Sequence, residues 1–175
     1  MNRRRLLLGA GLAALATASV LDHAGLFGYR PGERAQYESA EAPVCDIVSV
    51  NILELELPDG DRPTTRVRLR GVAPPDDDEP AMSYLREKVL ERRVRLHFDP
   101  NRAMRDADGN LSAYVYLLDG VDDTLNPPML NDLLIFEGLV RADHASPHIF
   151  SHTFDQREKL ARRAKRGIWT NAAAK

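Results

Sequence analysis

The sequence has little of three things: cysteine, net charge and long hydrophobic runs. Its single cysteine, Cys45, excludes an internal disulfide and, lying just before an expected strand, is predicted to be a small buried apolar residue. The formal net charge is only −2, and acidic residues slightly outnumber basic ones from residue 44 to the end. Domains that bind nucleic acid non-specifically are usually basic, so this balance argues against strong DNA binding by charge alone.

The longest apolar run is short for a membrane-spanning helix. Residues 6–21 form a run of 16 apolar or small residues, whereas a spanning helix needs roughly 20. Three arginines precede the run, and Ala16-Thr17-Ala18 offers a small-x-small cleavage site, so residues 1–21 are predicted to be a bacterial-type export signal. The order RRRLLL is also typical of a twin-arginine signal. We therefore expect an exported, periplasmic or extracytoplasmic protein, with an uncleaved membrane anchor as the alternative.

Composition and turn residues divide the rest of the chain. Hydrophobic residues make up 43% and charged residues 29% of the 175, which is typical of a soluble chain that buries one core. Residues 22–43 carry glycine and proline without a sustained hydrophobic period and are predicted to be a linker. We expect one domain over residues 44–170 and a tail over 171–175.

The most informative stretch is TRVRLRGVAPPDDDEP, residues 65–80. It begins with the two-residue alternation of a half-buried strand: Val67 and Leu69 share one face, and arginines 66, 68 and 70 share the other. Four carboxylates follow in a row at residues 76–79. This arrangement suits a phosphate-ester substrate, because cations hold the charged oxygens and a carboxylate activates water or holds a metal.

Four segments together resemble a known family. They are VRLRGVAPPD, RDADGNLSAYVYLLDG, MLNDLLIFEGLVRA and REKLARRAKRGIW, and they follow the order and spacing of the thermonuclease family, the staphylococcal-nuclease-like domain. The resemblance covers residues 44–169. It implies an α+β fold, a five-stranded OB-type barrel with three helices.

Periodicity and turn signals place the elements within such a fold. One bent strand is expected over 45–57, with a bulge near Ile52-Leu53 where the apolar alternation slips by one residue. Thr153 and Gln156 form a capping box for the last helix, and Ile168-Trp169 are expected to fold back onto the barrel. The remaining expected elements are strands over 66–72, 93–99 and 111–118, a turn at Asp108-Gly109, and helices over 80–90, 126–138 and 153–167.

The resemblance also implies a catalytic set, which this chain keeps only in part. The family cuts phosphodiesters with a calcium ion held by two aspartates, a glutamate base and two arginines. Arg68 matches the first arginine, and Asp76 stands where the glutamate is expected. The other positions are substituted: Asn51 and Ala73 stand at the two aspartate positions and Asn110 at the second arginine.

These substitutions predict a weak or inactive nuclease. Ala73 has no ligand oxygen and Asn51 at best a neutral one, so calcium finds little compensating charge. Asp76 retracts its carboxylate by on the order of 1 Å, which can cost roughly a hundredfold in rate. A missing charge-stabilising donor removes roughly 3–4 kcal/mol of transition-state stabilisation. We therefore expect a module that binds nucleic acid or a partner protein.

Two alternatives stay open. An active metal-dependent phosphodiesterase would use Arg68 with the carboxylates at 76–79, of which Asp76 and Asp77 are the candidate metal ligands, and Arg70 or Arg105 would replace the missing cation. A purely structural protein of the cell envelope, tethered by its N-terminal segment, is the other.

Two further groups of residues are candidates with plainer explanations. The helix Arg157–Arg166 is the one clearly basic surface, and it is either a solvated face or a contact for phosphate backbone. His144, His148 and His152 recur every four residues, which would suit a metal on a continuous helix, but Pro147 favours a polar loop. His144 and Ser146 also fall near the positions of the family's base-stacking tyrosines.

Overall fold

The computed structural model describes residues 32–119 and 126–170. The chain divides into two compact units, Met1–Gln36 and Tyr37–Lys175. The predicted export signal, most of the predicted linker and the tail lie outside the described residues, although the short helix α2 (Glu33–Tyr37) and the first residues of β1 fall within the 22–43 stretch. Over the described ranges, no helix is both long and apolar enough to cross a membrane.

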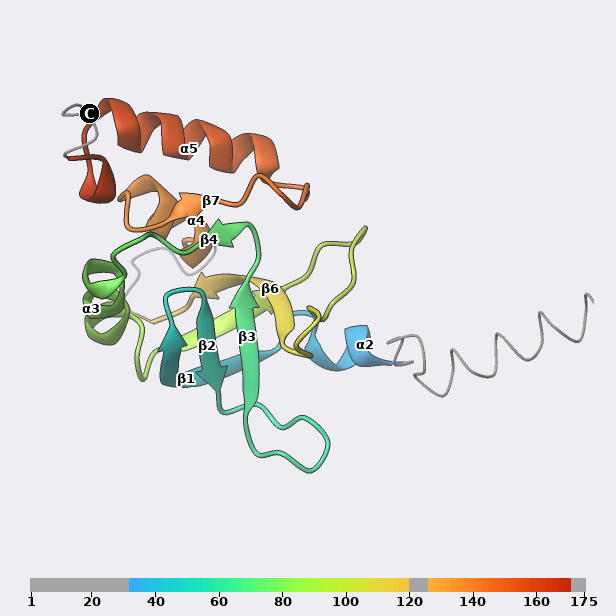
Figure 1. Ribbon diagram of the computed structural model, residues 1–175. Helices are drawn as coiled ribbons and strands as arrows, with labels where there is room; N and C mark the ends of the chain where they lie inside the picture. The colour runs from blue at the N-terminus through green and yellow to red at the C-terminus, as the bar shows by residue number, and fades with distance from the viewer. Residues whose placement is uncertain (1–31, 120–125, 171–175) are drawn as a thin grey trace, which may run out of the picture. The chain divides into compact units, whose positions relative to one another are not determined.

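The second unit is built on a closed five-stranded barrel with the strand order β1-β2-β3-β6-β5 (Figure 1). Neighbouring strands are antiparallel except β3 and β6, which run parallel. The barrel confirms the predicted α+β, OB-type fold. Its strands are β1 (Glu41–Ser49), β2 (Ile52–Leu55), β3 (Thr65–Leu69), β5 (Arg93–His97) and β6 (Leu111–Leu117).

Three helices and a small second sheet complete the unit. The sheet pairs β4 (Val72–Ala73) with β7 (Arg141–Ala142). Helix α4 packs on β6, and α5 packs on α4 and β7 (Figure 1). The helices are α3 (Glu79–Lys88), α4 (Leu130–Phe136) and α5 (Ser151–Arg163), followed by the 3-10 turn η1 (Gly167–Trp169).

Strand β3 has the alternation that its sequence predicts. Val67 and Leu69 are fully buried in the barrel core, whereas Arg66 is exposed and Arg68 is half-buried on the opposite face. Gly71, just past the strand, has a φ of 74°, which only glycine adopts at little cost. This turn redirects the chain into β4 and sends the arginine face toward one edge of the barrel.

The predicted bent strand over 45–57 is wrong in its connectivity. It is a hairpin, β1–β2, in which Ser49 pairs with Ile52 across a turn at Val50-Asn51, so the slip in alternation is a reversal of the chain. Two irregularities in the pairing fall at Cys45 and Val48. Each turns its side chain outward. Cys45 is therefore exposed, against the prediction that it is buried, and Val48 is 37% exposed.

The ends of the last two helices also differ from the prediction. Helix α4 begins at Leu130 instead of Asn126-Pro127, because the preceding residues are extended along β6, where Pro128 accepts a hydrogen bond from Leu117 N–H. Helix α5 begins at Ser151 with Phe150 as its cap, so the Thr153–Gln156 capping box is not used. It ends at Arg163, four residues before Gly167.

The segment after α5 turns back to the helical layer. Ile168 N–H donates at 2.9 Å to the carbonyl oxygen of Gly138, the glycine with a φ of 69° just past the end of α4. The Trp169 ring lies 4.0 Å from the Arg162 guanidinium carbon. Ile168 and Trp169 thus fasten the end of α5 to the end of α4.

Candidate functional site

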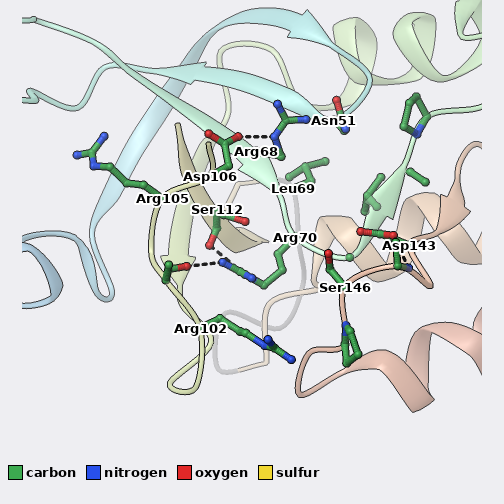
Figure 2. Close-up of a pocket in the computed structure, with 17 residues that line it drawn as sticks. Asn51, Arg68, Leu69, Arg70, Arg102, Arg105, Asp106, Ser112, Asp143 and Ser146 are labelled. Carbon is green, nitrogen blue, oxygen red and sulfur yellow. Dashed lines mark hydrogen bonds and ion pairs between the residues drawn. The ribbon is translucent and has the colours of Figure 1, made fainter. Parts of the chain in front are cut away.

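A pocket of about 690 Å³ opens where β3 ends (Figure 2). Its walls come from β3 and the segment after it, the β5–β6 connection with the start of β6, the loop between β7 and α5, and the β1–β2 turn. Four arginines are among its lining residues. The charged and polar residues that line it are Asn51, Arg68, Arg70, Arg102, Arg105, Asp106, Ser112, Asp143 and Ser146.

Arg68 reaches from β3 to the β5–β6 connection. Its Nε forms a very short ion pair with Asp106 Oδ2, and its Nη2 lies 3.1 Å from Asp108 Oδ2. Figure 2 shows the Asp106 contact at the edge of the pocket. Arg68, which the sequence predicts to match the family's first arginine, thus already pairs with two carboxylates of the protein itself.

Asp106 is the centre of this contact. Besides Arg68, it accepts hydrogen bonds from the backbone N–H groups of Asp108 and Asn110, at 3.0 and 2.9 Å, and from Asn110 Nδ2 at 3.0 Å. Burial acts to raise the pKa of Asp106, but the hydrogen bonds from Arg68 and Asn110 outweigh it and hold the pKa below its ordinary value. Asn110, at the position of the missing second arginine, thus serves to fix this carboxylate.

Arg70 lies deeper in the pocket and is held by backbone oxygens. Its Nη2 donates to Ala103 O at 2.6 Å and its Nε to Ser112 O at 3.3 Å. Burial lowers the pKa of this guanidinium from its usual value. Buried Asn131 on α4 fixes the strand at this point, because its Nδ2 donates to Arg70 O at 2.9 Å.

The other two arginines of the pocket differ from each other. Arg105 forms a double contact with Asp59, with both distances 3.0 Å, and donates to Gly109 O at 2.7 Å. The Arg102 side chain is exposed and makes no ion pair or hydrogen bond with any residue in the described ranges. Of the two replacements predicted for the missing cation, Arg105 is therefore committed to Asp59, and Arg70 faces the pocket.

A buried polar chain lies behind Arg70 and Gly71. Tyr114 OH lies 2.9 Å from His148 Nδ1 and 3.4 Å from Asp99 Oδ2, and Ile149 N–H donates to Asp99 at 3.0 Å. Burial lowers the pKa of His148 and raises that of Tyr114. The neutral forms of His148 and Tyr114 are therefore favoured, and this buried hydrogen-bond network supports the loop after β7.

The acidic run lies outside the pocket. Asp76 is bound by Arg141 of β7 at 2.7 Å, although its side chain is 89% exposed. Asp77 Oδ1 accepts a hydrogen bond from Glu79 N–H at 3.3 Å, at the start of α3. Neither Asp76 nor Asp77 is among the residues that line the pocket beside Arg68. The structure therefore does not place the acidic run in the pocket beside Arg68.

The residues present do not fit the calcium ion that the fold family implies. Ala73 and Asn51, at the two aspartate positions, both line the pocket, and Asn51 Oδ1 already accepts a hydrogen bond from Ser49 Oγ at 3.0 Å. Within residues 32–119 and 126–170, no three His, Cys, Asp or Glu side chains gather in a way that could hold a metal. No metal-dependent step is derived for this pocket.

The three predicted histidines are separated in the structure. His144 lies in the loop after β7, with Nδ1 3.1 Å from Asp155 Oδ1 and Nε2 3.4 Å from Glu158 Oε2. His148 packs against Phe154, and His152 lies on α5. Glu158 is buried and also accepts Ala142 N–H at 2.9 Å, so its contacts fasten α5 to β7.

Half of the cations of the basic helix are engaged with carboxylates. Arg157 Nε donates to Asp132 at 2.9 Å, Arg162 pairs with Glu158, and Arg166 lies 3.8 Å from Glu137. Lys159, Arg163 and Lys165 make no ion pair with any residue that the structure describes. The uncompensated charge of α5 is therefore smaller than its sequence suggests.

The sequence did not point to several residues of the pocket. Asp106 was noticed only as part of a turn, and Arg102 and Asp143 were not singled out. The signal that could have found Asp106 is the D-x-D-G-N pattern that surrounds the missing second arginine, since a carboxylate there meets Arg68. No local pattern marks Arg102, which reaches the pocket from an irregular connection.

The closed mixed barrel, the helices packed on β6 and β7, and the arginine-lined pocket define a nuclease-type OB barrel. A family model described as staphylococcal nuclease homologue matches residues 66–171, more than half of the chain, and the chain belongs to that family. No curated protein matches it. The resemblance drawn from the four sequence segments is thereby confirmed.

Proposed function

We propose that this nuclease-family domain binds nucleic acid through the phosphate backbone and hydrolyses it weakly or not at all. The observation that carries the proposal is the pocket at the end of β3, where four arginines line one cavity and the family's aspartate positions hold Asn51 and Ala73. Guanidinium groups bind phosphate oxygens in a fork geometry. Cations without a set of metal-binding carboxylates favour binding over hydrolysis.

The pocket is a better candidate for this interface than α5. Three cations of the basic segment Arg157–Arg166 have carboxylate partners, and a paired surface cation gains little from a second anion. The formal net charge of −2 also argues against a large basic surface as the main source of affinity. Binding to a partner protein through the same pocket is the other outcome that the experiment below distinguishes.

The test measures binding and cleavage together with the purified full chain. End-labelled denatured DNA and RNA are incubated with the protein in calcium, manganese or zinc. Bound and free strands are separated on native gels at several salt concentrations, and cleavage is followed on denaturing gels. We expect salt-sensitive retention of intact strands, with Arg66→Ala, a change on the same face of β3 outside the pocket, behaving like the wild type.

Two results would contradict the proposal. Robust cleavage that Arg68→Ala abolishes, and that Asp76→Asn and Asp77→Asn also destroy, establishes an active phosphodiesterase that uses the acidic run. Retention of neither DNA nor RNA by the wild type excludes a nucleic-acid interface and leaves a partner protein or a structural role.

We also propose that the protein is exported. The support is the sequence alone, namely three arginines followed by the apolar run over residues 6–21. Expression of the full chain in a bacterium, followed by fractionation and N-terminal sequencing, tests this. Cleavage after Ala18 in the periplasmic fraction is expected, and full-length protein that stays in the cytosol contradicts it.

A further inference from the structure

The four arginines of the pocket are not equally available to a ligand. Arg68 contacts Asp106 and Asp108, and Arg105 makes a double contact with Asp59. A phosphate that binds at either position must compete with carboxylates fixed in place by the chain. The binding free energy gained is then only the difference between the new arginine–phosphate ion pair and the arginine–carboxylate pair that it replaces.

Arg70 and Arg102 lack such partners. The hydrogen bonds of the Arg70 side chain go to two backbone carbonyls, and the Arg102 side chain has no hydrogen-bond or ion-pair partner in the described part of the chain. Asp99 lies close enough to Arg70 to attract it, but hydrogen bonds from Asn101 and Ile149 already satisfy that carboxylate. A partly buried guanidinium without a direct counter-ion is costly, and an anion offsets that cost.

Figure 2 shows Arg70 and Arg102 on the same side of the pocket, with Ser146 across from them. A carboxylate, Asp143, also lines the pocket; it accepts Ala145 N–H at 2.8 Å and makes no ion pair with Arg70 or Arg102. The uncompensated positive charge of the pocket is therefore concentrated at Arg70 and Arg102, away from the position of the family's arginine.

The described walls of the pocket carry no aromatic ring on which a base could stack. Besides its polar residues, they are formed by Leu69, Gly71, Val72, Ala73, Pro74, Ala103, Ala145 and Pro147, so no aromatic side chain is among its described lining residues. His144, near one family position for a stacking tyrosine, is held by Asp155 and Glu158 outside this pocket. Stacking on aromatic rings is the usual way a single strand's bases are bound.

We infer that the phosphate subsite of this pocket consists of Arg70 and Arg102, displaced from Arg68, and that it binds the sugar-phosphate backbone without contacting the bases. This inference rests on the proposed function and adds where the phosphate binds and which part of the strand is recognised.

Fluorescence anisotropy with the full chain tests both parts. The probes are a labelled oligothymidylate and an abasic oligomer with the same number of phosphates. Arg102→Ala is the main variant, because this exposed side chain has no partner whose loss could disturb folding. Arg70→Lys is the second, since it retains the charge but not the fork, and circular dichroism checks that it is folded. Arg66→Ala is the matched control.

The dissociation constants of the two oligomers for the wild type are expected to agree within about threefold. Removal of one base that stacks on the protein would instead weaken binding roughly tenfold or more. Arg102→Ala is expected to weaken both about tenfold, the loss of one charge-assisted hydrogen bond. Arg68→Ala is expected to weaken binding less than Arg102→Ala does.

Each contrary outcome has a distinct meaning. If wild type binds but Arg102→Ala and Arg70→Lys bind equally well, or Arg68→Ala costs more, the subsite is wrong and the proposed function stands. If the abasic oligomer binds more than tenfold weaker, the bases are contacted and the inference is overturned. If wild type binds neither oligomer, the proposed function itself fails.

Discussion

At the scale of single residues, Asp106 changes what Arg68 can do. In the family pattern, this arginine is expected to meet the phosphate of the substrate, whereas here it meets carboxylates from the β5–β6 connection. Asn110, which replaces the second arginine, donates to the same Asp106. With Asn110 at the predicted position of the second arginine, Asp106 pairs with Arg68 instead.

The low pKa of Asp106 predicts a pH-dependent stability. Because hydrogen bonds lower this pKa in the folded state, the carboxylate stabilises the fold fully above the ordinary value of about 3.9, and this contribution is lost as pH falls through the lower folded-state pKa. Asp106→Asn should therefore lower the free energy of unfolding at neutral pH, and the difference from wild type should shrink in acid.

Urea unfolding at a series of pH values measures this. Asp108→Asn is the control, because Asp108 also contacts Arg68 but its side chain is 74% exposed, so a smaller change is expected. A difference between wild type and Asp106→Asn that is independent of pH down to strong acid would contradict the role assigned to the ionised carboxylate.

Gly71 is predicted to be essential at the turn after β3. Its φ is 74°, and a Cβ there would lie 2.4 Å from His148 Nε2 and 2.8 Å from Phe154. Gly71→Ala should cost about 1–2 kcal/mol for the left-handed conformation and about 1–3 kcal/mol for the overlap. Gly60, with a φ of 60° and open space around it, is the control. Equal losses of stability in the two alanine variants would contradict the packing argument.

At the scale of elements, α4 is joined to the barrel by one buried amide. Asn131 is fully buried, its Oδ1 accepts Val115 N–H at 2.9 Å, and its Nδ2 donates to Arg70 O. The helix thus holds β6 and the end of β3 at fixed positions. The geometry of the pocket depends on that connection, although Asn131 does not line it.

Asn131→Ala should destabilise the protein by about 2–4 kcal/mol, because buried backbone groups lose their partners. Thermal or urea unfolding measures the loss. Asp132→Ala, the next residue on α4, removes only the contact with Arg157 at the surface and should cost less than about 1 kcal/mol. A loss at Asn131 no larger than that at Asp132 would show that the amide does not connect the elements.

The elements differ in how well their sequence predicts them. Strand β3 and helix α3 have one buried face and one polar face over their whole length, so periodicity predicts both closely. The β1–β2 hairpin was mistaken for one strand because the turn at Val50-Asn51 lacks glycine and proline and contains a buried valine. The start of α5 depends on contacts among Tyr114, Phe150 and Phe154 that are distant in sequence.

At the scale of the whole molecule, the family could be predicted from the sequence, but the arrangement of charges could not. The order and spacing of four segments indicated the family, whereas the substitutions assigned to Ala73 and Asn110 stay predictions. Which arginines have counter-ions depends on where the 98–110 connection lies, and that connection has no periodic pattern. The pairing of Arg68 with Asp106 therefore required the structure.

The salt dependence of binding distinguishes the pocket from a basic surface. For a single strand, the logarithm of the association constant falls by about 0.7 per phosphate contact for each unit of the logarithm of salt concentration. Contact with Arg70 and Arg102 predicts a slope between about −1 and −2. A slope steeper than about −4 would assign much of the affinity to α5 and other surface cations. Anisotropy titrations over a range of salt concentrations measure it.

The most direct test is a crystal structure of the protein soaked with calcium and a nucleoside 3′,5′-bisphosphate. We expect a phosphate within hydrogen-bond distance of Arg70 and Arg102, with Arg68 still paired to Asp106 and no calcium ion held by three side chains. A calcium ion bound by Asp76 and two further carboxylates, with a phosphate against Arg68, would contradict the account and establish a metal-dependent nuclease site.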